Sequence, residues 1–337
     1  MTKNKREKIF SQLRKDLVSG TWVVYSTKRS KRPDFSKKKV EEKESKEDIR
    51  NCPFCKKGVS DQEEDVLVYL KDNDDWSLKV FPNKFPAFCS EYKDIHKREH
   101  GPFEVIDGVG YHEVLVTEDH QKDIPEMEVA SVAEMIDAYQ ERYIALMNRK
   151  HIKYVCIFKN YGTEAGASIK HPHSQIVAMP VIDPDVFRSL SGSEEYYKSH
   201  LECVHCTMIE WEKESGKRVI FENEEFIAVC PFVSRVPFEM RIYPKKHLSY
   251  FERITDEQKI KLAETMKFCL SKLKKNLNDP AYNLFLHTAP CNGQIYDHYH
   301  WHFEIFPKTN IWAGLELSTG IEVCSIIPER AARMLRE

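Results

Sequence analysis

One stretch of the sequence, His171-Pro172-His173-Ser174-Gln175-Ile176-Val177-Ala178-Met179, places two histidines and a glutamine at alternate positions ahead of an apolar run. A short apolar run predicts a β-strand, and residues i, i+2 and i+4 of a strand share one face. We therefore expect the side chains of His171, His173 and Gln175 to project together. Such a trio suits a reactive site, a metal site or a buried cluster, so its neighbours along the chain must distinguish these possibilities.

The same order of motifs occurs twice along the chain. Each copy has a Cys-x-x-Cys motif, then a single histidine, then a histidine-rich stretch. The first copy contains Cys52, Cys55, His120 and His171, and the second contains Cys203, Cys206, His247 and His298. In both copies 51 residues separate the single histidine from the start of the histidine-rich stretch. Matched motifs in one order indicate a duplicated unit.

The spacing of apolar residues predicts the secondary structure of each copy. A helix-like period of 3.6 residues covers residues 129–149 and 256–277. Strand-like runs cover residues 113–117, 154–159, 175–179, 240–243, 282–287 and 302–306. We predict an α+β fold of two tandem histidine-triad-like units, each an antiparallel sheet with a packed helix. The units are residues 1–192 and 193–337, with a Ser-rich stretch at the boundary.

The first Cys-x-x-Cys motif and its histidines indicate a metal site. Two thiolates and two imidazoles suit the tetrahedral coordination of zinc, and the two-residue spacer lets both sulfurs face one point. We expect a zinc site made of Cys52, Cys55, His120 and His171. The alternative is that the cysteines are small buried residues and that His120 lies on the surface. The wide spacing excludes a compact nucleic-acid-binding zinc finger.

The second copy predicts a second zinc site with Cys203, Cys206 and His247 as ligands. Two histidines remain candidates for its fourth ligand. The 51-residue spacing favours His298, whereas a bulge in the strand would favour His300. The alternative is that these trailing histidines form a solvated or buried cluster.

His173 is the candidate nucleophile. If its neighbour His171 is tied to a metal, His173 is held in place as a neutral imidazole, the form that attacks phosphorus. Gln175 is an uncharged donor that suits a phosphoryl oxygen whose charge grows in the transition state. The alternative is a buried histidine beside the metal site.

Composition narrows the classes of function. The chain has 337 residues, which favours two domains. Its 51 Lys and Arg against 53 Asp and Glu give a net charge of −2, which argues against a nucleic-acid-binding protein. No apolar run approaches the ~20 residues of a membrane span, and no secretion signal is visible. We expect a cytoplasmic protein whose ten cysteines are metal ligands or core residues rather than disulfides.

Together these motifs resemble the galactose-1-phosphate uridylyltransferase family of the histidine-triad superfamily, of which ADP-glucose phosphorylases are relatives. The resemblance spans nearly the whole chain. It includes the loop Val80–Pro86, the motif Gly108-x-Gly-x-His112-Glu-Val-x-Val and the segment Trp312–Glu316. It further implies substrate-binding roles for Arg29, Arg32, Asn83, Asn160, Ser168 and Glu316.

The resemblance also implies a reaction. His173 attacks the α-phosphorus of a nucleotide sugar, a nucleotidyl-histidine forms, and a hexose 1-phosphate leaves before a second one attacks. Because a sugar phosphate needs no general acid to leave, Gln175 can stand where histidine-triad hydrolases have a third histidine. The expected protein is a UDP-glucose–hexose-1-phosphate uridylyltransferase of galactose metabolism. Its partners are a nucleotide sugar, a hexose 1-phosphate and a second copy in a homodimer, without nucleic acid or membrane.

Several alternatives stay open. Ser174 stands where the best-known uridylyltransferases carry glycine, and serine there also occurs in ADP-glucose phosphorylase, so an adenylyltransferase with phosphate as acceptor is the main rival. Asn310 and Leu315 fall near a hexose-phosphate-binding lysine and a tyrosine of some members, which leaves the sugar open. Some members bind iron at the second metal site. A nucleotide hydrolase and a zinc-stabilised interaction protein are the remaining classes.

Overall fold

The computed structural model describes residues 11–26, 28, 49–55, 59, 61–91 and 94–337. Ten strands of this part of the chain form one antiparallel sheet. The first half supplies β3 (Leu67–Leu70), β4 (Trp76–Pro82), β7 (Tyr111–Thr117), β8 (Tyr154–Tyr161) and β9 (His173–Met179). The second half supplies β10 (Val219–Glu222), β11 (Phe226–Val229), β12 (Met240–Pro244), β13 (Tyr282–His287) and β14 (His302–Pro307).

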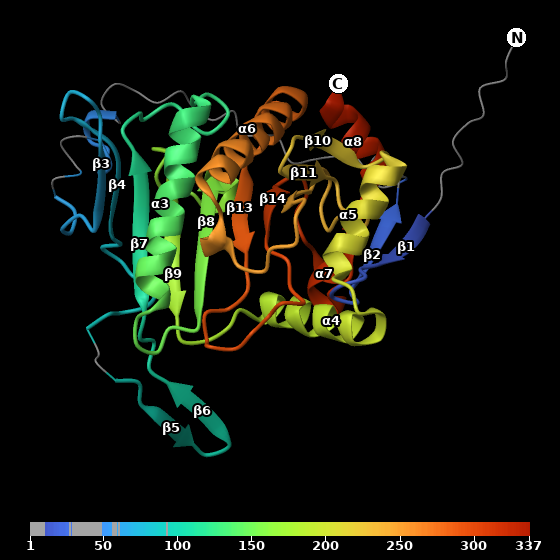
Figure 1. Cartoon of the computed structure of the whole chain (residues 1–337), viewed down its shortest axis with the longest axis horizontal. Coiled ribbons are helices and arrows are strands. Elements are labelled where there is room, and N and C mark those ends of the chain that lie inside the picture. The colour runs from blue at the N-terminus through green and yellow to red at the C-terminus, as the bar shows by residue number, and fades with distance from the viewer. Residues whose placement is uncertain (1–10, 27, 29–48, 56–58, 60, 92–93) are drawn as a thin grey trace, which may run out of the picture.

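The sheet is built from two units with the same strand order. The full order across the sheet is β10-β11-β12-β14-β13-β8-β9-β7-β4-β3 (Figure 1). Counted from the outer edge inward, the strands of each half follow chain order except that the last two are exchanged, β14 before β13 and β9 before β8. The halves meet where β13 pairs with β8, with Phe285 opposite Phe158 and Asn283 opposite Asn160. The expected duplication is therefore visible in the topology, and the two units share one continuous sheet.

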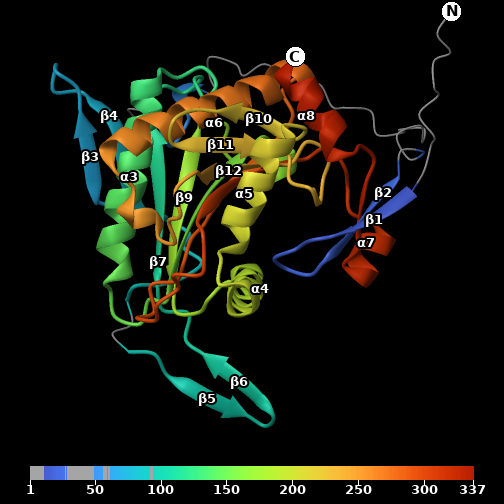
Figure 2. The same cartoon turned by 45° about the vertical axis from the view of Figure 1, so that its right-hand side comes forward.

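Two helices cover one face of the sheet. They are α3 (Val129–Met147) and α6 (Asp256–Leu277), which follow β7 and β12 respectively (Figures 1 and 2). The buried residues of α3 recur at helical spacing and include Val132, Ile136, Tyr139, Tyr143 and Leu146. They form one core with Val155, Ile157, Ile176 and Ala178 of the sheet. The predicted α+β class, antiparallel sheets with packed helices, is confirmed.

The sequence explains where α6 begins. The side chain of Thr255 accepts a hydrogen bond from the backbone N–H of Gln258, and the Gln258 side chain accepts one from the Thr255 N–H. This reciprocal cap satisfies two backbone donors that would otherwise lack partners. The side chain of Gln140 in α3 donates to the carbonyls of Glu252 and Ile254 just before this cap, which fixes the two helices relative to each other.

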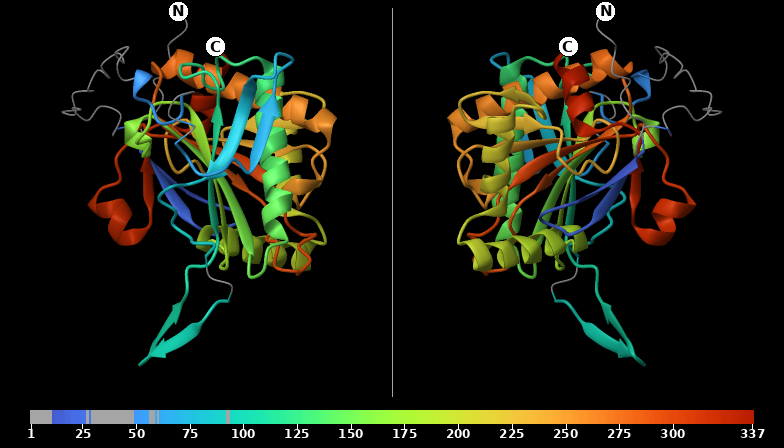
Figure 3. Two further views of the ribbon diagram at one scale, coloured as in Figure 1. Left: turned by 90° about the vertical axis from the view of Figure 1, so that its left-hand side faces the viewer. Right: turned by 90° about the vertical axis from the view of Figure 1, so that its right-hand side faces the viewer.

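The remaining elements surround this body. Helices α4 (Pro184–His200) and α5 (Val204–Ser215) join the two units, and α7 (Gly314–Thr319) and α8 (Pro328–Arg336) lie near the C-terminus. A small sheet contains β1 (Ser11–Lys15), β2 (Trp22–Ser26) and β15 (Glu322–Cys324). The part of the chain that the structure describes also includes the short 3₁₀ helices η2 (Thr163–Ala165) and η3 (Phe251–Arg253). The hairpin of β5 (Lys97–His100) and β6 (Phe103–Ile106) extends away from the body (Figure 3).

The predicted boundary at residue 192 lies inside α4, whose first turn is capped by the side chain of Asp183. The division into residues 1–192 and 193–337 stays a prediction, since both halves contribute strands to one sheet. Among the helices of the described residues, none combines the length and the apolar character needed to cross a membrane.

Gly192 generates a prediction about stability. A Cβ atom at this position would lie 1.7 Å from the carbonyl oxygen of Val18, in the turn between β1 and β2. Gly192→Ala should therefore lower the free energy of unfolding by about 1–3 kcal/mol, because the small sheet must move away from α4. Gly314→Ala is the matched control, since a Cβ there meets no atom within 4 Å. Urea unfolding, followed by circular dichroism, measures the stability of both variants. Equal free energies of unfolding would contradict the prediction.

Candidate active site and metal centres

The first predicted metal cluster is brought together by three separate segments. Cys52 and Cys55 precede β3, His120 follows β7, and His171 lies just before β9. The potential ligand atoms of these four residues all lie within 4.8 Å of one another. The Sγ of Cys55 is 3.2 Å from Nδ1 of His120 and 3.6 Å from Nδ1 of His171. Two sulfurs and two ring nitrogens therefore converge on one point and could hold a metal ion.

A hydrogen bond to the backbone fixes which ring nitrogen of His171 faces the two cysteines. Its Nε2–H donates to the carbonyl oxygen of Thr117 at 2.7 Å, so Nδ1 keeps its lone pair toward the cysteines. Burial lowers the pKa of His171 to about 4, which keeps the ring neutral near pH 7. A backbone acceptor on the far nitrogen is the usual support of a metal-binding histidine.

Of the two histidines left open as the fourth ligand of the second cluster, the structure brings His300 to the cysteines and not His298, which the equal spacing favoured. Cys203, Cys206, His247 and His300 place their ligand atoms within 4.8 Å of one another. The Nε2–H of His300 donates to the carbonyl oxygen of Pro244, the last residue of β12, as His171 donates to the last residue of β7. The equal 51-residue spacing misled because the connection from β13 to β14 is longer than the one from β8 to β9.

His173 is oriented by the backbone of its neighbour. It is the first residue of β9 and has 8% of its surface exposed. Its Nδ1–H donates to the carbonyl oxygen of His171 at 2.8 Å, which leaves the lone pair on Nε2. Burial lowers the pKa of the ring, so it stays neutral near pH 7. The result is an uncharged imidazole whose nucleophilic nitrogen is Nε2.

His173 and Gln175 lie on the face of the sheet away from α3. The residue between them, Ser174, points to the helix and lies 2.6 Å from the hydroxyl of Tyr139. Gln175 is directly opposite Phe158 in the sheet. Phe158 lines a cavity of about 380 Å³, so the cavity opens on the same face as the two candidate catalytic residues.

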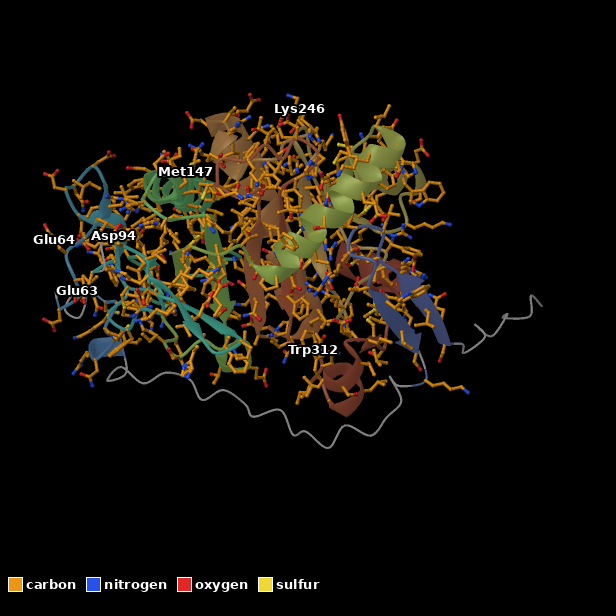
Figure 4. All side chains as sticks on the ribbon, turned by 90° about the horizontal axis from the view of Figure 1, so that it is seen from below. Glu63, Glu64, Asp94, Met147, Lys246 and Trp312 are labelled. Atoms are coloured by element: carbon orange, nitrogen blue, oxygen red, sulfur yellow. The ribbon has the colours of Figure 1, made fainter. Side chains whose placement is uncertain are left out.

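The cavity collects residues from both units. Polar and charged side chains in its lining include Asn160, Asn283, Arg235, His287 and Lys308. Its apolar lining includes Phe158, Phe285, Phe306 and Trp312. Trp312 lies beside α7, near the edge of the body (Figure 4). Asn283 donates to the side-chain oxygen of Asn160 at 2.8 Å, directly across the seam between the units.

The other predicted substrate-binding residues are scattered. The amide nitrogen of Asn83 lies 3.2 Å from Nε2 of His112, next to Gln175. Ser168 is exposed in the connection between β8 and β9. Glu316 is buried and its carboxylate accepts from the N–H of Ala313, so it caps α7 and does not line the cavity. Arg29 and Arg32 lie outside the described residues.

The second unit contains a counterpart of the candidate active site, which the equal spacing of the two copies does not locate. His302 and Glu304 stand where the first unit has His173 and Gln175, and the Nδ1–H of His302 donates to the carbonyl of His300. His302 has only 2% of its surface exposed. The sequence signal was the alternation His300, His302 and Glu304, which matches His171, His173 and Gln175 once the preceding His298 is left out.

Ion pairs occupy this second site. The carboxylate of Glu304 lies 2.6 Å from Arg235 and 2.9 Å from Arg241. Burial opposes the charge, but the two arginines hold the pKa of Glu304 well below its usual range. His287, His302 and Glu304 also converge closely enough to hold a metal ion. The second unit thus keeps the scaffold of the first with a charged network in place of its neutral glutamine.

Comparison with known proteins gives a consistent result across the chain. The family model described as the N-terminal domain of galactose-1-phosphate uridyl transferase matches residues 1–183, and that of the C-terminal domain matches residues 155–336. The chain is 34% identical to the ADP-glucose phosphorylase of Arabidopsis thaliana over 97% of this chain and 92% of that protein. It is 30% identical to the galactose-1-phosphate uridylyltransferase of Thermotoga maritima over 97% of this chain and 98% of that protein.

Solved structures agree. The crystal structure of an ADP-glucose phosphorylase from Arabidopsis thaliana with bound ADP-glucose matches with a TM-score of 0.83 and 30% identity, over 97% of this chain and 99% of that one. A uridylyltransferase structure matches with a TM-score of 0.73 and 28% identity, over 97% of this chain and 98% of that one.

The two Cys/His clusters generate a prediction about metal content. Cys52→Ser and Cys203→Ser should each reduce the bound metal to about half that of the wild type and lower the melting temperature, because one thiolate ligand is lost and metal binding contributes to folding. Elemental analysis of the purified chains measures this. Cys89→Ser is the control, since Cys89 belongs to neither cluster. An unchanged metal content in Cys52→Ser would show that the first cluster does not bind a metal ion.

Proposed function

The chain belongs to the galactose-1-phosphate uridylyltransferase family, and we propose that its reaction proceeds through a covalent uridylyl group on His173. The enzyme is a nucleotidyltransferase that acts on hexose 1-phosphates, with UDP-glucose as the uridylyl donor. The observation that carries the mechanism is the neutral ring of His173, whose Nδ1–H is held by the His171 carbonyl.

The first half-reaction follows from this geometry. The lone pair on Nε2 of His173 attacks the α-phosphorus of UDP-glucose, and a nitrogen–phosphorus bond forms. The bond from that phosphorus to the bridging oxygen breaks, and glucose 1-phosphate leaves with the electron pair. The ring becomes positively charged, and the hydrogen bond from Nδ1–H to the His171 carbonyl stabilises that charge.

The second half-reaction reverses these steps with another acceptor. A phosphate oxygen of galactose 1-phosphate attacks the uridylyl phosphorus, UDP-galactose forms, and the neutral ring of His173 is restored. Neither leaving group needs a proton, which suits an uncharged Gln175 at this position. Its amide N–H donates to a phosphoryl oxygen as negative charge increases there.

The cavity supports a charged sugar substrate. Its volume of about 380 Å³ is in the range of small-molecule sites. Its lining has positive charge on Lys308 and on Arg235, which is paired with Glu304, and negative charge on Asp183 and Asp185. Asn160 and Asn283 supply donors and acceptors for hydroxyl groups. Exposed apolar residues on either side of the lining residue Trp312 in the sequence, Ile311, Leu315 and Leu317, support a second copy of the chain as a partner. We propose a homodimer on this basis.

We propose zinc for both Cys/His clusters. Two thiolates and two imidazoles at one point are the donor set of structural zinc, whose binding holds distant segments together. Cys52, Cys55, His120 and His171 would tie the segment before β3 to β7 and β9. Cys203, Cys206, His247 and His300 would tie α5 to β12 and β14.

A second candidate function has a specific observation in its favour. The identity to the ADP-glucose phosphorylase, 34%, exceeds the 30% to the Thermotoga maritima uridylyltransferase. In this alternative His173 accepts an adenylyl group, and inorganic phosphate is the acceptor. The chemistry at His173 is the same, so only the base and the acceptor distinguish the two.

The deciding experiment weighs the intact protein after incubation with UDP-glucose, ADP-glucose or GDP-glucose without an acceptor. We expect one added uridylyl group from UDP-glucose and its removal by galactose 1-phosphate. An adenylyl adduct that only phosphate removes would establish the alternative. No adduct from any donor would contradict the covalent mechanism.

Replacement of the nucleophile gives a sharper prediction. His173→Gly should lower the rate of uridylyl transfer to below about a thousandth of wild type, because the nitrogen that forms the covalent bond is lost. Metal content should stay unchanged, since His173 is not in the first cluster. His100→Gly, at an exposed position of β5, is the control and should keep the wild-type rate. A wild-type rate in His173→Gly would show that another residue is the nucleophile.

A further inference from the structure

We propose that His112 is a positioning residue, which fixes the side-chain amide of Gln175 so that its NH₂ group faces the transferred phosphoryl group. This inference rests on the proposed function and adds to it a residue that touches neither the nucleophile nor the metal clusters. It explains why a histidine follows the two glycines of the Gly108-x-Gly-x-His112 motif.

The sheet makes His112 and Gln175 neighbours. In the pairing of β7 with β9, His112 lies opposite Val177 and Gln175 lies opposite Val114. The two side chains are therefore diagonal neighbours on one face, within reach of each other. The Nε2 atom of His112 lies 2.8 Å from Oε1 of Gln175.

A backbone donor determines the tautomer of His112. The N–H of Ala87 points to Nδ1 of His112 at 3.1 Å, and a backbone N–H can only donate. Nδ1 therefore holds a lone pair. Burial lowers the pKa of His112, which favours the neutral ring, so the single ring proton is on Nε2. That N–H donates to Oε1 of Gln175, whereas the amide nitrogen of Asn83, 3.2 Å from Nε2, carries its own hydrogens and cannot accept.

This bond orients the amide of Gln175. With Oε1 held by His112, the NH₂ group lies on the opposite side and keeps both hydrogens for an acceptor. A flipped amide would place its N–H groups against the N–H of His112, two donors without an acceptor. His112 thus selects the orientation in which Gln175 donates to a phosphoryl oxygen.

The same histidine holds the neighbouring loop. The N–H of Asn83 donates to the carbonyl of His112 at 2.7 Å, and the N–H of Phe85 donates to the side-chain oxygen of Asn83 at 2.8 Å. With the bond from Ala87, the loop of residues 83–87 is attached to His112 at both ends. The loop and the amide donor therefore keep one relative position.

The second unit has side-chain contacts between the equivalent two positions. Glu239 and Glu304 occupy the places of His112 and Gln175, and Arg241 lies 3.2 Å from the first and 2.9 Å from the second. Both units thus join these two positions through polar contacts, which in the second unit are the ion pairs of Arg241 with Glu239 and Glu304. In the first unit the contact is direct and neutral.

Kinetics of four variants test the proposal: His112→Leu, His112→Gln, Gln175→Ala and the double variant His112→Leu/Gln175→Ala. We expect His112→Leu to lower kcat by about 10–100-fold, with KM for UDP-glucose within about threefold of wild type, because the donor to the transition state is misoriented. His112→Gln, which has one donor and one acceptor, should recover part of kcat. In the Gln175→Ala background, His112→Leu should have less than about a twofold effect.

An equal loss in both backgrounds, or an unchanged kcat, would overturn the proposal. The tautomer provides a readout that does not depend on activity. Nuclear magnetic resonance of wild-type protein with ¹⁵N-labelled histidine should show His112 neutral, with its proton on Nε2, assigned by its loss in His112→Gln. A proton on Nδ1, or a charged ring, would overturn the orientation of Gln175. Absence of uridylyl transfer by the wild type would instead contradict the proposed function.

Discussion

The hydrogen bond from Nδ1–H of His173 to the carbonyl of His171 is the contact on which the candidate active site depends. Three groups of His171 have separate partners. Its Nδ1 faces the cysteines, its Nε2–H donates to Thr117 at the end of β7, and its carbonyl holds the next histidine of the strand. A shift at the metal cluster would therefore move the backbone that orients His173. The first Cys/His cluster and the candidate nucleophile are therefore linked through a single residue, His171.

The sheet explains why two similar units give one candidate active site. The seam between β8 and β13 places Asn160 and Asn283 side by side, so the cavity, which opens on the same face of the sheet as His173, contains residues of both units. At the equivalent place in the second unit, Glu304 and two arginines fill the space with ion pairs. The second unit thereby contributes apolar and charged lining residues to the cavity of the first.

Much of this arrangement was predictable because it depends on local patterns. The Cys-x-x-Cys motifs, the helical period of α3 and α6, and the alternation at His173 and Gln175 each encode geometry within a few residues. The equal spacing favoured His298 over His300 because it assumes connections of equal length, and the β13–β14 connection is longer. Nothing near Glu316 in the sequence shows that its carboxylate caps its own helix. The role of His112 depends on strand pairing and on a loop residue, Ala87, that no local pattern connects to it.

The continuity of the ten-stranded sheet across two similar units has a consequence for evolution. If two identical chains formed such a sheet by pairing edge to edge, every residue would be the same in both halves, and their association would depend on concentration. In a single polypeptide the two halves are always together, and a residue of one half can be substituted without a change at the equivalent position of the other half. One half can then have the neutral Gln175 while the other has Glu304 paired with two arginines. The asymmetry between Gln175 and Glu304 is what that freedom permits.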